Sequence, residues 1–350
     1  MRLASFRQGR EARLGIVGDG KIIDFNAGLG RLLPKTNRRE KPFPTVDMKG
    51  FLALEGRSLQ LARKVESWVR TQEEGRSRTS LRGLIFDLSK VKLLPPLSNP
   101  PKIMCLARNY VSHVQETIGD GPVPTDLLIF MKPSTTIIGP GEPIFIPPQC
   151  QELDHEIELA VVIGRKGRYI PQEMAMEHVA GYTILNDVSD REYVGKKNPN
   201  WTVNWFFMKA QDTFAPLGPY LVLKDEIKDP HGLRLRLWVN GQLRQDSQSE
   251  EMIFKIPEII SRISSFVTLE PGDIIATGTP TGTSFSTRQY LQEGDMVECE
   301  VEGIGRLENP VKVEKPVYRK NFPTPCHFFT PPPHPSPLPH LRGEGKGEGA

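Results

Sequence analysis

Two glutamates separated by one residue stand where a strand is predicted to enter the core of the protein. Glu156 and Glu158 lie in the segment 152–164, which opens with alternating polar and apolar residues and closes with the apolar run 159–163. Residues i and i+2 of a strand share a face, so the two side chains should point the same way, about 7 Å apart. Two carboxylates beside a buried run repel each other and resist desolvation, and a bound cation relieves both costs. Oxygen ligands favour Mg²⁺, Mn²⁺ or Ca²⁺ over softer metals.

A third carboxylate, Asp187, follows the apolar strand predicted over 181–185, a position where functional side chains are common. With Glu156 and Glu158 it could complete a cation site. A solvated strand face at a sheet edge would also explain the two glutamates, and a turn would explain the aspartate. By spacing alone, the three residues point to a metal site without establishing one.

Mainly strands must position these carboxylates. Short apolar runs bounded by Gly, Pro or Asn predict strands at 103–106, 159–163, 181–185, 233–239 and 273–276. The Asn-Gly pair at 240–241 predicts a hairpin turn. The clearest helix, over 257–266, has apolar residues at helical spacing and should cover a sheet. Because no helix follows each strand in turn, a doubly wound parallel sheet is disfavoured, and we predict an α+β fold that is mainly β.

Three regions divide the chain. Residues 1–95 should form a small α+β domain, with a hairpin that turns at Asp-Gly 19–20 and a helix over 51–69. Prolines 95, 96, 100 and 101 form a stiff linker, and the main domain spans 96–318. The Pro- and Gly-rich stretch 319–350 cannot bury apolar surface, so we predict a disordered tail.

Composition narrows the classes of function. The net charge of +3 in 350 residues is too small to favour nucleic acid or an anionic membrane as a partner. No apolar run reaches the ~18 residues of a membrane helix, and the first residues lack the apolar core of a signal peptide. The four cysteines show no paired spacing, which argues against a zinc site or a disulfide framework. A cytoplasmic location is the default expectation.

Six motifs in order resemble the fumarylacetoacetate hydrolase family, in particular its short bacterial-type members. They are RNYVSH at 108–113, FMKPS at 130–134 with IGPG at 138–141, DHEIEL at 154–159, AGYTILNDVS at 180–189, DTFAPLGP at 212–219 and LEPGDIIATGTP at 269–280. The resemblance covers roughly residues 100 to 313, and the first ~95 residues resemble the small N-terminal domain of longer members. It implies a mixed β-sheet roll, a homodimer and one Mg²⁺ or Mn²⁺ ion, with Ca²⁺ in some relatives.

The resemblance also implies a role for each matching residue. The metal ligands would be Glu156, Glu158 and Asp187. A catalytic pair on a short lid helix would be His113 and Glu116. Lys209 would be a further catalytic residue that stabilises an oxyanion, and the remaining positions that contact substrate would be Lys132, Arg191 and Thr279.

The residue types fit these roles without requiring them. His113 and Glu116 are three apart, so on a helix the carboxylate could orient the imidazole, although an exposed helix pair has the same spacing. Lys132 lies between apolar residues, an unusual place for a solvated lysine unless its stem packs against them. Thr279 lies in a Gly- and Pro-rich loop, where turn formation alone could explain it.

The function implied is hydrolysis of a carbon–carbon bond in a small diketo acid of the acylpyruvate or fumarylacetoacetate type. The metal would hold the departing enolate as a Lewis acid. A hydroxymuconate-type isomerase or an oxaloacetate-type decarboxylase could use the same site, and a non-catalytic keto-acid binding protein is a further alternative. The sequence departs from many relatives at Val194, where they carry glutamine, and in the loop 195–205, so no particular keto acid is assigned.

Overall fold

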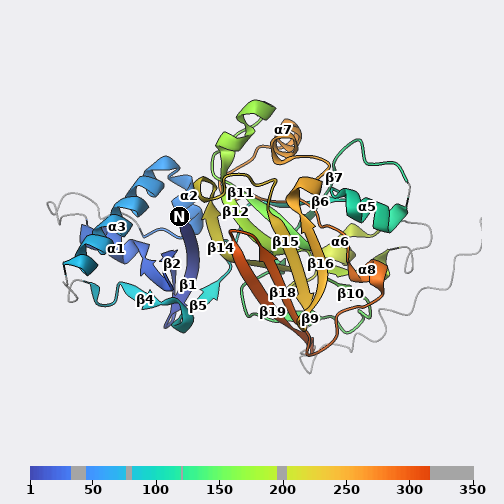
Figure 1. The fold of residues 1–350 in the computed structure, drawn as a ribbon, viewed down its shortest axis with the longest axis horizontal. Helices are drawn as coiled ribbons and strands as arrows, with labels where there is room; N and C mark the ends of the chain where they lie inside the picture. Colours follow the sequence, from blue (N-terminus) through green and yellow to red (C-terminus); the bar gives the residue numbers. More distant parts are fainter. Residues whose placement is uncertain (33–44, 76–80, 120, 195–202, 316–350) are drawn as a thin grey trace, which may run out of the picture. The chain divides into compact units, whose positions relative to one another are not determined.

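The computed structural model describes residues 1–32, 45–75, 81–119, 121–194 and 203–315. Most of its elements are strands (Figure 1). Residues Met1–Glu314 pack as one unit. The predicted division at residue 95 stays a prediction, and the predicted tail lies outside the described residues. The α+β class with mainly β structure is confirmed.

The described strands are β1 (Arg2–Gln8), β2 (Glu11–Gly18), β3 (Lys21–Asp24), β4 (Ile85–Asp87), β5 (Lys92–Leu94), β6 (Ile103–Ala107), β7 (Leu128–Lys132), β8 (Ile137–Ile138), β9 (Ile144–Ile146), β10 (Leu153–Asp154), β11 (Ile157–Ile163), β12 (Val179–Asn186), β13 (Ser189–Asp190), β14 (Ala215–Leu223), β15 (Arg234–Val239), β16 (Gln242–Gln248), β17 (Ile274–Ala276), β18 (Met296–Val301) and β19 (Gly305–Val313). The described α-helices are α1 (Phe25–Leu32), α2 (Met48–Ala53), α3 (Gly56–Glu74), α5 (Val111–Ile118), α6 (Trp205–Lys209), α7 (Ile256–Phe266) and α8 (Ser284–Thr287).

The larger sheet runs in the order β4-β3-β2-β1-β14-β12-β11-β17-β6-β7, and β5 and β8 pair with β1 and β14. Most neighbours are antiparallel, but β17 pairs parallel to β6, so the sheet is mixed as predicted. The hairpin of β2 and β3 turns at Asp19 and Gly20, both with positive φ, which is the geometry that Asp-Gly favours.

A second sheet runs in the order β16-β15-β18-β19-β9. Figure 1 shows β15, β16, β18 and β19 lying side by side. The predicted hairpin of β15 and β16 turns at Asn240 and Gly241, again with positive φ at both. This sheet matters for the site because β16 carries the buried Gln245.

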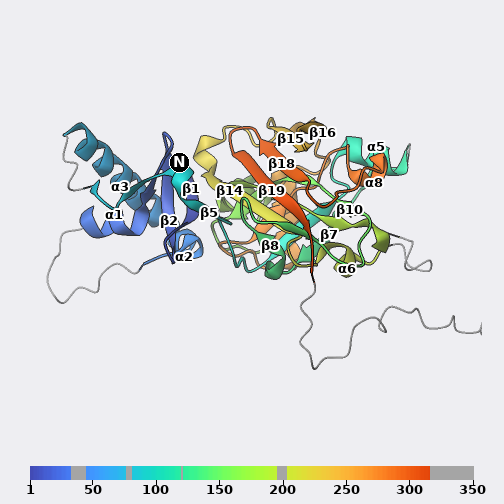
Figure 2. The ribbon, with the colours of Figure 1, turned by 90° about the horizontal axis from the view of Figure 1, so that it is seen from below.

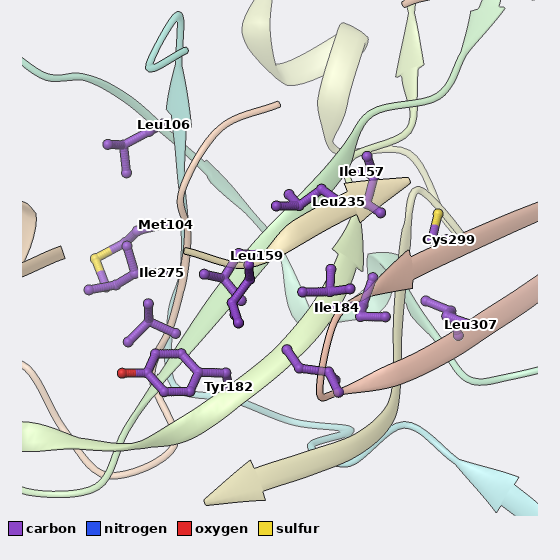
Figure 3. Packing of buried hydrophobic residues seen from close by; sticks show 14 of the residues in the cluster. Met104, Leu106, Ile157, Leu159, Tyr182, Ile184, Leu235, Ile275, Cys299 and Leu307 are labelled. Carbon is purple, nitrogen blue, oxygen red and sulfur yellow. The ribbon is translucent and has the colours of Figure 1, made fainter. Parts of the chain in front are cut away.

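The central strand β11 is buried on both faces, which explains its unbroken apolar run. Leu159 and Val161 belong to one core cluster, where side chains of β6, β17, β11 and β12 meet those of β15, β18 and β19 (Figure 3). Ala160 and Val162 belong to a second cluster that includes residues of α1, α2 and α3. Alternate residues therefore fill two different cores, and any polar residue on this strand is buried.

The helices follow the apolar periodicity, with one correction. The predicted α7 forms as expected. The helix expected over 51–69 is instead two helices, because Glu55 has a φ of 48° between α2 and α3. Figure 2 shows α1 lying beside α3 and β2. Of the helices in the described ranges, none is long and apolar enough to cross a membrane.

Asn309 on β19 offers a test of how the second sheet holds the IGPG turn. Its buried amide donates to the carbonyl oxygens of Gly139 at 2.9 Å and Glu142 at 2.8 Å. Asn309→Ala leaves acceptors unpaired, so we expect the free energy of unfolding to fall by about 1–3 kcal/mol. Urea denaturation measures this loss. The exposed Gln248→Ala should change it by less than about 0.5 kcal/mol, and equal losses in the two variants would contradict the assignment.

Candidate metal centre and active site

The three predicted metal ligands converge where β11 and β12 meet. Glu158 is on β11, Glu156 directly precedes this strand, and Asp187 directly follows β12. The amide of Asp187 donates to the carbonyl of Glu156 at 2.8 Å, and the amide of Glu156 donates to Asn186 Oδ1 at 2.9 Å. One oxygen from each carboxyl group lies within 4.8 Å of the others, and all three residues are buried. The antiparallel pairing of the two strands thus creates the cluster.

Three predicted cationic residues also lie in this cluster. Lys209 Nζ donates to Glu156 Oε2 at 2.6 Å and to Asp187 Oδ2 at 2.5 Å. Lys132 donates to Asp187 Oδ1. Arg191 donates to Glu156 Oε1, and its Nε donates to Asp154 Oδ2 at 2.7 Å. Asp154, to which sequence reasoning gave no role, is the anchor that holds Arg191 in place.

The compensation of charge is uneven among the carboxylates. Burial favours the neutral acid, but the charges of Arg191 and Lys209 outweigh it and hold the pKa of Glu156 at about 2. Burial raises the pKa of Glu158 well above its usual value, and the neighbouring Asp187 and Glu156 raise it further. The amide of Gly278, 2.7 Å from Glu158 Oε2, only partly offsets this. Converging buried oxygens with an excess of negative charge fit a hard divalent cation such as Mg²⁺ or Mn²⁺.

The buried lysines differ in their electrostatics. Burial lowers the pKa of Lys132, and the charge of Asp187 only partly opposes this. For Lys209 the charges of Asp187 and Glu156 outweigh burial, so its pKa lies above the ordinary value. The ammonium group of Lys209 also lies 5.2 Å from the centre of the Phe130 ring. Lys209 is therefore a firmly held cation at neutral pH.

A cavity of about 450 Å³ opens onto the cluster. Its wall includes five of the predicted site residues, which are His113, Glu156, Arg191, Lys209 and Thr279. The other four lie next to residues of this wall. Glu116 is adjacent to His113, and Asp187 accepts hydrogen bonds from both Lys209 and Lys132. Glu158 belongs to the same carboxylate cluster as Glu156. Val194, the departure noted in the sequence, lines the cavity, and residues 195–202 lie outside the described residues.

His113 and Glu116 lie one turn apart on α5, as their spacing predicted. The distance from His113 Nδ1 to Glu116 Oε2 is 3.4 Å, which is long for a hydrogen bond. The other oxygen of Glu116 accepts from the amide of Gly282 at 2.9 Å. Burial raises the pKa of Glu116, but the bonds from His113 and Gly282 outweigh it and leave the pKa below its usual value. An ionised carboxylate is thus positioned to orient the imidazole.

Gln245 on β16 was missed by sequence reasoning, because β16 carries polar residues on both faces. Its amide Nε2 donates to Thr279 Oγ1 and to the carbonyl of Pro280, both at 2.9 Å, and its Oε1 accepts from the amide of Ile157 at 3.1 Å. The Thr279 hydroxyl donates to the carbonyl of Ile157 at 2.9 Å. Because the hydroxyl proton of Thr279 is already donated to Ile157, this hydroxyl could only accept a hydrogen bond from a substrate.

These features together define an enzyme-like site, in which a pocket adjoins both a histidine–glutamate pair and a buried cluster of three carboxylates that could hold a cation. Comparison with known proteins gives the family. Residues 102–312 match the model of the "Fumarylacetoacetate (FAA) hydrolase C-terminal" family. This protein belongs to the fumarylacetoacetate hydrolase family, as its motifs predicted.

Relatives include enzymes with different named activities. A mitochondrial oxaloacetate tautomerase of Xenopus laevis is 40% identical over 317 residues, which cover 89% of this chain and 90% of that protein. The solved maleylpyruvate hydrolase of Sphingobium sp. SYK-6, in complex with manganese(II) and pyruvate, is 30% identical, with a TM-score of 0.66 over 90% of this chain and 100% of that one. A 5-carboxymethyl-2-hydroxymuconate delta-isomerase of Mycobacterium smegmatis is 32% identical, with a TM-score of 0.64 and the same coverage. This protein is an enzyme of that family.

The excess charge at Glu158 generates a prediction about metal binding. Glu158→Gln keeps the shape of the side chain and removes the carboxylate whose charge is least compensated. We expect it to weaken Mn²⁺ binding by at least about tenfold, which is about 1.4 kcal/mol, and to leave the metal-free protein at least as stable as the wild type. Thermal unfolding after chelation, with and without added Mn²⁺, measures both effects.

A matched control for this experiment is Glu173→Gln, at an exposed position of the 3₁₀ helix Gln172–His178. It should respond to Mn²⁺ as the wild type does. A Glu158→Gln variant that Mn²⁺ stabilises as strongly as the wild type would remove Glu158 from the set of ligands.

The network around Gln245 predicts coupling to the pair of His113 and Glu116. Because Gln245 holds the loop 279–281 and Gly282 holds Glu116, we expect Gln245→Met to lower kcat about tenfold. Combined with Glu116→Gln, the two losses in kcat should be less than additive. Asn309→Ala, which removes another buried amide, should lower stability and leave kcat unchanged. Fully additive losses in the double variant would show that Gln245 acts independently of Glu116.

Proposed function

We propose that this protein is a divalent-metal-dependent tautomerase that interconverts the keto and enol forms of a small 2-oxo dicarboxylic acid of the oxaloacetate class. The observation that carries the proposal is the under-compensated carboxylate cluster beside a pocket with a cation and a histidine. The relatives that align over about nine-tenths of both chains include oxaloacetate tautomerases. This ranks tautomerisation above the C–C hydrolysis that the sequence put first.

The cluster would hold the metal through Glu156, Glu158 and Asp187. A bound divalent cation supplies a Lewis acid that draws electron density toward the oxo oxygen of the substrate. The protein's own contribution is to orient the 2-oxo acid against the wall of the cavity, which includes both His113 and Lys209.

Tautomerisation then needs one proton removed and one supplied. His113 takes a proton from the carbon next to the oxo group, and the electron pair of that bond forms the carbon–carbon double bond of the enol. The carbonyl electron pair moves onto oxygen, which takes a proton from the Lys209 ammonium group. Exchange with solvent restores both side chains, and the reverse sequence converts the enol to the keto form. Glu116 keeps the imidazole of His113 in the tautomer that accepts the proton.

Hydrolysis of a carbon–carbon bond in a diketo acid is the second candidate. The same His113 and Glu116 could take a proton from water instead of carbon, and the solved maleylpyruvate hydrolase supports this use of the fold. Lys209 and Arg191 would then stabilise the oxyanion. Whether water is positioned beside the substrate decides between the two reactions.

A substrate comparison tests the proposal. Purified protein with Mg²⁺ or Mn²⁺ is given enol-oxaloacetate, whose loss is followed by ultraviolet absorbance, and an acylpyruvate, whose cleavage is followed in the same way. We expect metal-dependent tautomerisation to be the faster reaction by at least about tenfold in kcat/KM. Faster cleavage of the acylpyruvate would overturn the proposal in favour of the hydrolase, and pyruvate release from oxaloacetate would indicate a decarboxylase.

Removal of the proposed base gives a prediction for one residue. His113→Ala should lower kcat by about 10²-fold or more, the usual contribution of general base catalysis. Mn²⁺ affinity should be unchanged, because His113 is outside the cluster of three carboxylates. Gln115→Ala, at an exposed position of the same helix, is the control and should keep full activity. A His113→Ala variant with wild-type kcat would remove this histidine from the reaction.

We also propose a homodimer. The end strand β7 and the helix α6 expose large apolar side chains, among them Met131 at 55% and Phe206 at 67%. A second copy is the partner that would cover such a surface symmetrically. The cytoplasmic location stays a prediction, and the oxaloacetate tautomerase named above is mitochondrial by name.

A further inference from the structure

The cations on the wall of the cavity are not equally available to a substrate. Arg191 and Lys209 are both bonded to buried carboxylates. Arg108 also lines the cavity, and its side chain is exposed. Within the described ranges of the chain, it forms no hydrogen bond or ion pair through its guanidinium group. Of these three cations it is the one to which the described residues supply no counter-charge.

The backbone of Arg108 is held in an unusual conformation. Its φ is +56°, a region that residues other than glycine rarely occupy. Arg108 is the first residue after β6 and directly precedes Asn109. The buried side-chain amide of Asn109 donates to the carbonyl oxygens of Thr277 at 2.8 Å and Phe254 at 3.2 Å. The chain is therefore fixed on both sides of Arg108, and it is the rest of the structure that maintains the conformation.

Close packing supports this bend. Gly278 has a φ of +94°, and a Cβ added to it would lie 2.9 Å from Asn109 Cβ and 3.3 Å from the carbonyl oxygen of Leu106. Two neighbouring segments thus meet with no room for a side chain at Gly278. Because the amide of Gly278 also donates to Glu158, the bend that presents Arg108 is attached to the carboxylate cluster itself.

We propose that Arg108 is a specificity-determining residue that binds the distal carboxylate of a dicarboxylic substrate. The inference rests on the proposed function and names the recognition that the function requires. With the 2-oxo acid end at the carboxylate cluster, the second carboxylate needs a cation elsewhere on the wall. The planar guanidinium group can bind it through two parallel hydrogen bonds. Val194, which also lines the cavity, is apolar and cannot bind a carboxylate.

The test compares two acids with the same carbon chain. Oxaloacetate and 2-oxobutyrate differ in the distal carboxylate, and their dissociation constants are measured by calorimetry on Mg²⁺-loaded protein. Arg108→Asn removes the charge and keeps a residue that tolerates positive φ. We expect the Kd of oxaloacetate to rise by about tenfold or more and that of 2-oxobutyrate to change by less than about twofold.

Arg288→Asn is the matched control, because Arg288 is an exposed arginine with a φ of 59° outside the wall of the cavity. It should leave both dissociation constants unchanged. Equal weakening of the two acids by Arg108→Asn, or no weakening of oxaloacetate, would overturn the assignment. Binding does not require turnover, so an absence of tautomerisation by the wild type would count against the proposed function and leave this comparison valid.

Discussion

Electrostatic repulsion among three buried carboxylates is the constraint on which the rest of the site depends. Lys132, Lys209 and Arg191 neutralise part of it, but their contacts go to Glu156, Asp187 and Asp154, whereas Glu158 receives a backbone amide. A divalent cation would use oxygens to which Lys209 now donates. In the proposed reaction, occupancy of the cluster would free Lys209 from these oxygens and so couple the binding of metal to the supply of a proton.

The fold meets this constraint with rigid elements rather than with loops alone. The strand β11 fills two cores with alternate residues, so Glu158 cannot turn away from the cluster without disturbing the packing of its neighbours. Asn186 at the end of β12 and Asp187 after it hold Glu156, the residue before β11, by hydrogen bonds. The repelling groups are thus held close together by a buried scaffold, as a preorganised site requires.

The sequence allowed the strands, hairpins and carboxylate spacing to be predicted, because each depends on local pattern. It indicated the pairing of His113 with Glu116 for the same reason. It could not reveal the break at Glu55, where a local φ interrupts an otherwise continuous apolar periodicity. Nor could it reveal the roles of Gln245 and Asp154, since their partners lie far away in the sequence. Gln245 on β16 meets the loop after β17, and the pairing of β10 with β13 brings Asp154 to Arg191.

The position of β1 in the larger sheet has a consequence for how the chain can be divided. This strand pairs with β2 and β5, and also with β14, so the first residues of the chain supply the neighbour of a strand from the main region. Leu3 and Leu221 are both buried in the same core cluster. A shortened protein that lacks the N-terminal segment would leave β14 with an unpaired, apolar border that invites self-association. The N-terminal segment therefore pairs with β14 of the larger sheet and shields its edge, in addition to forming helices of its own.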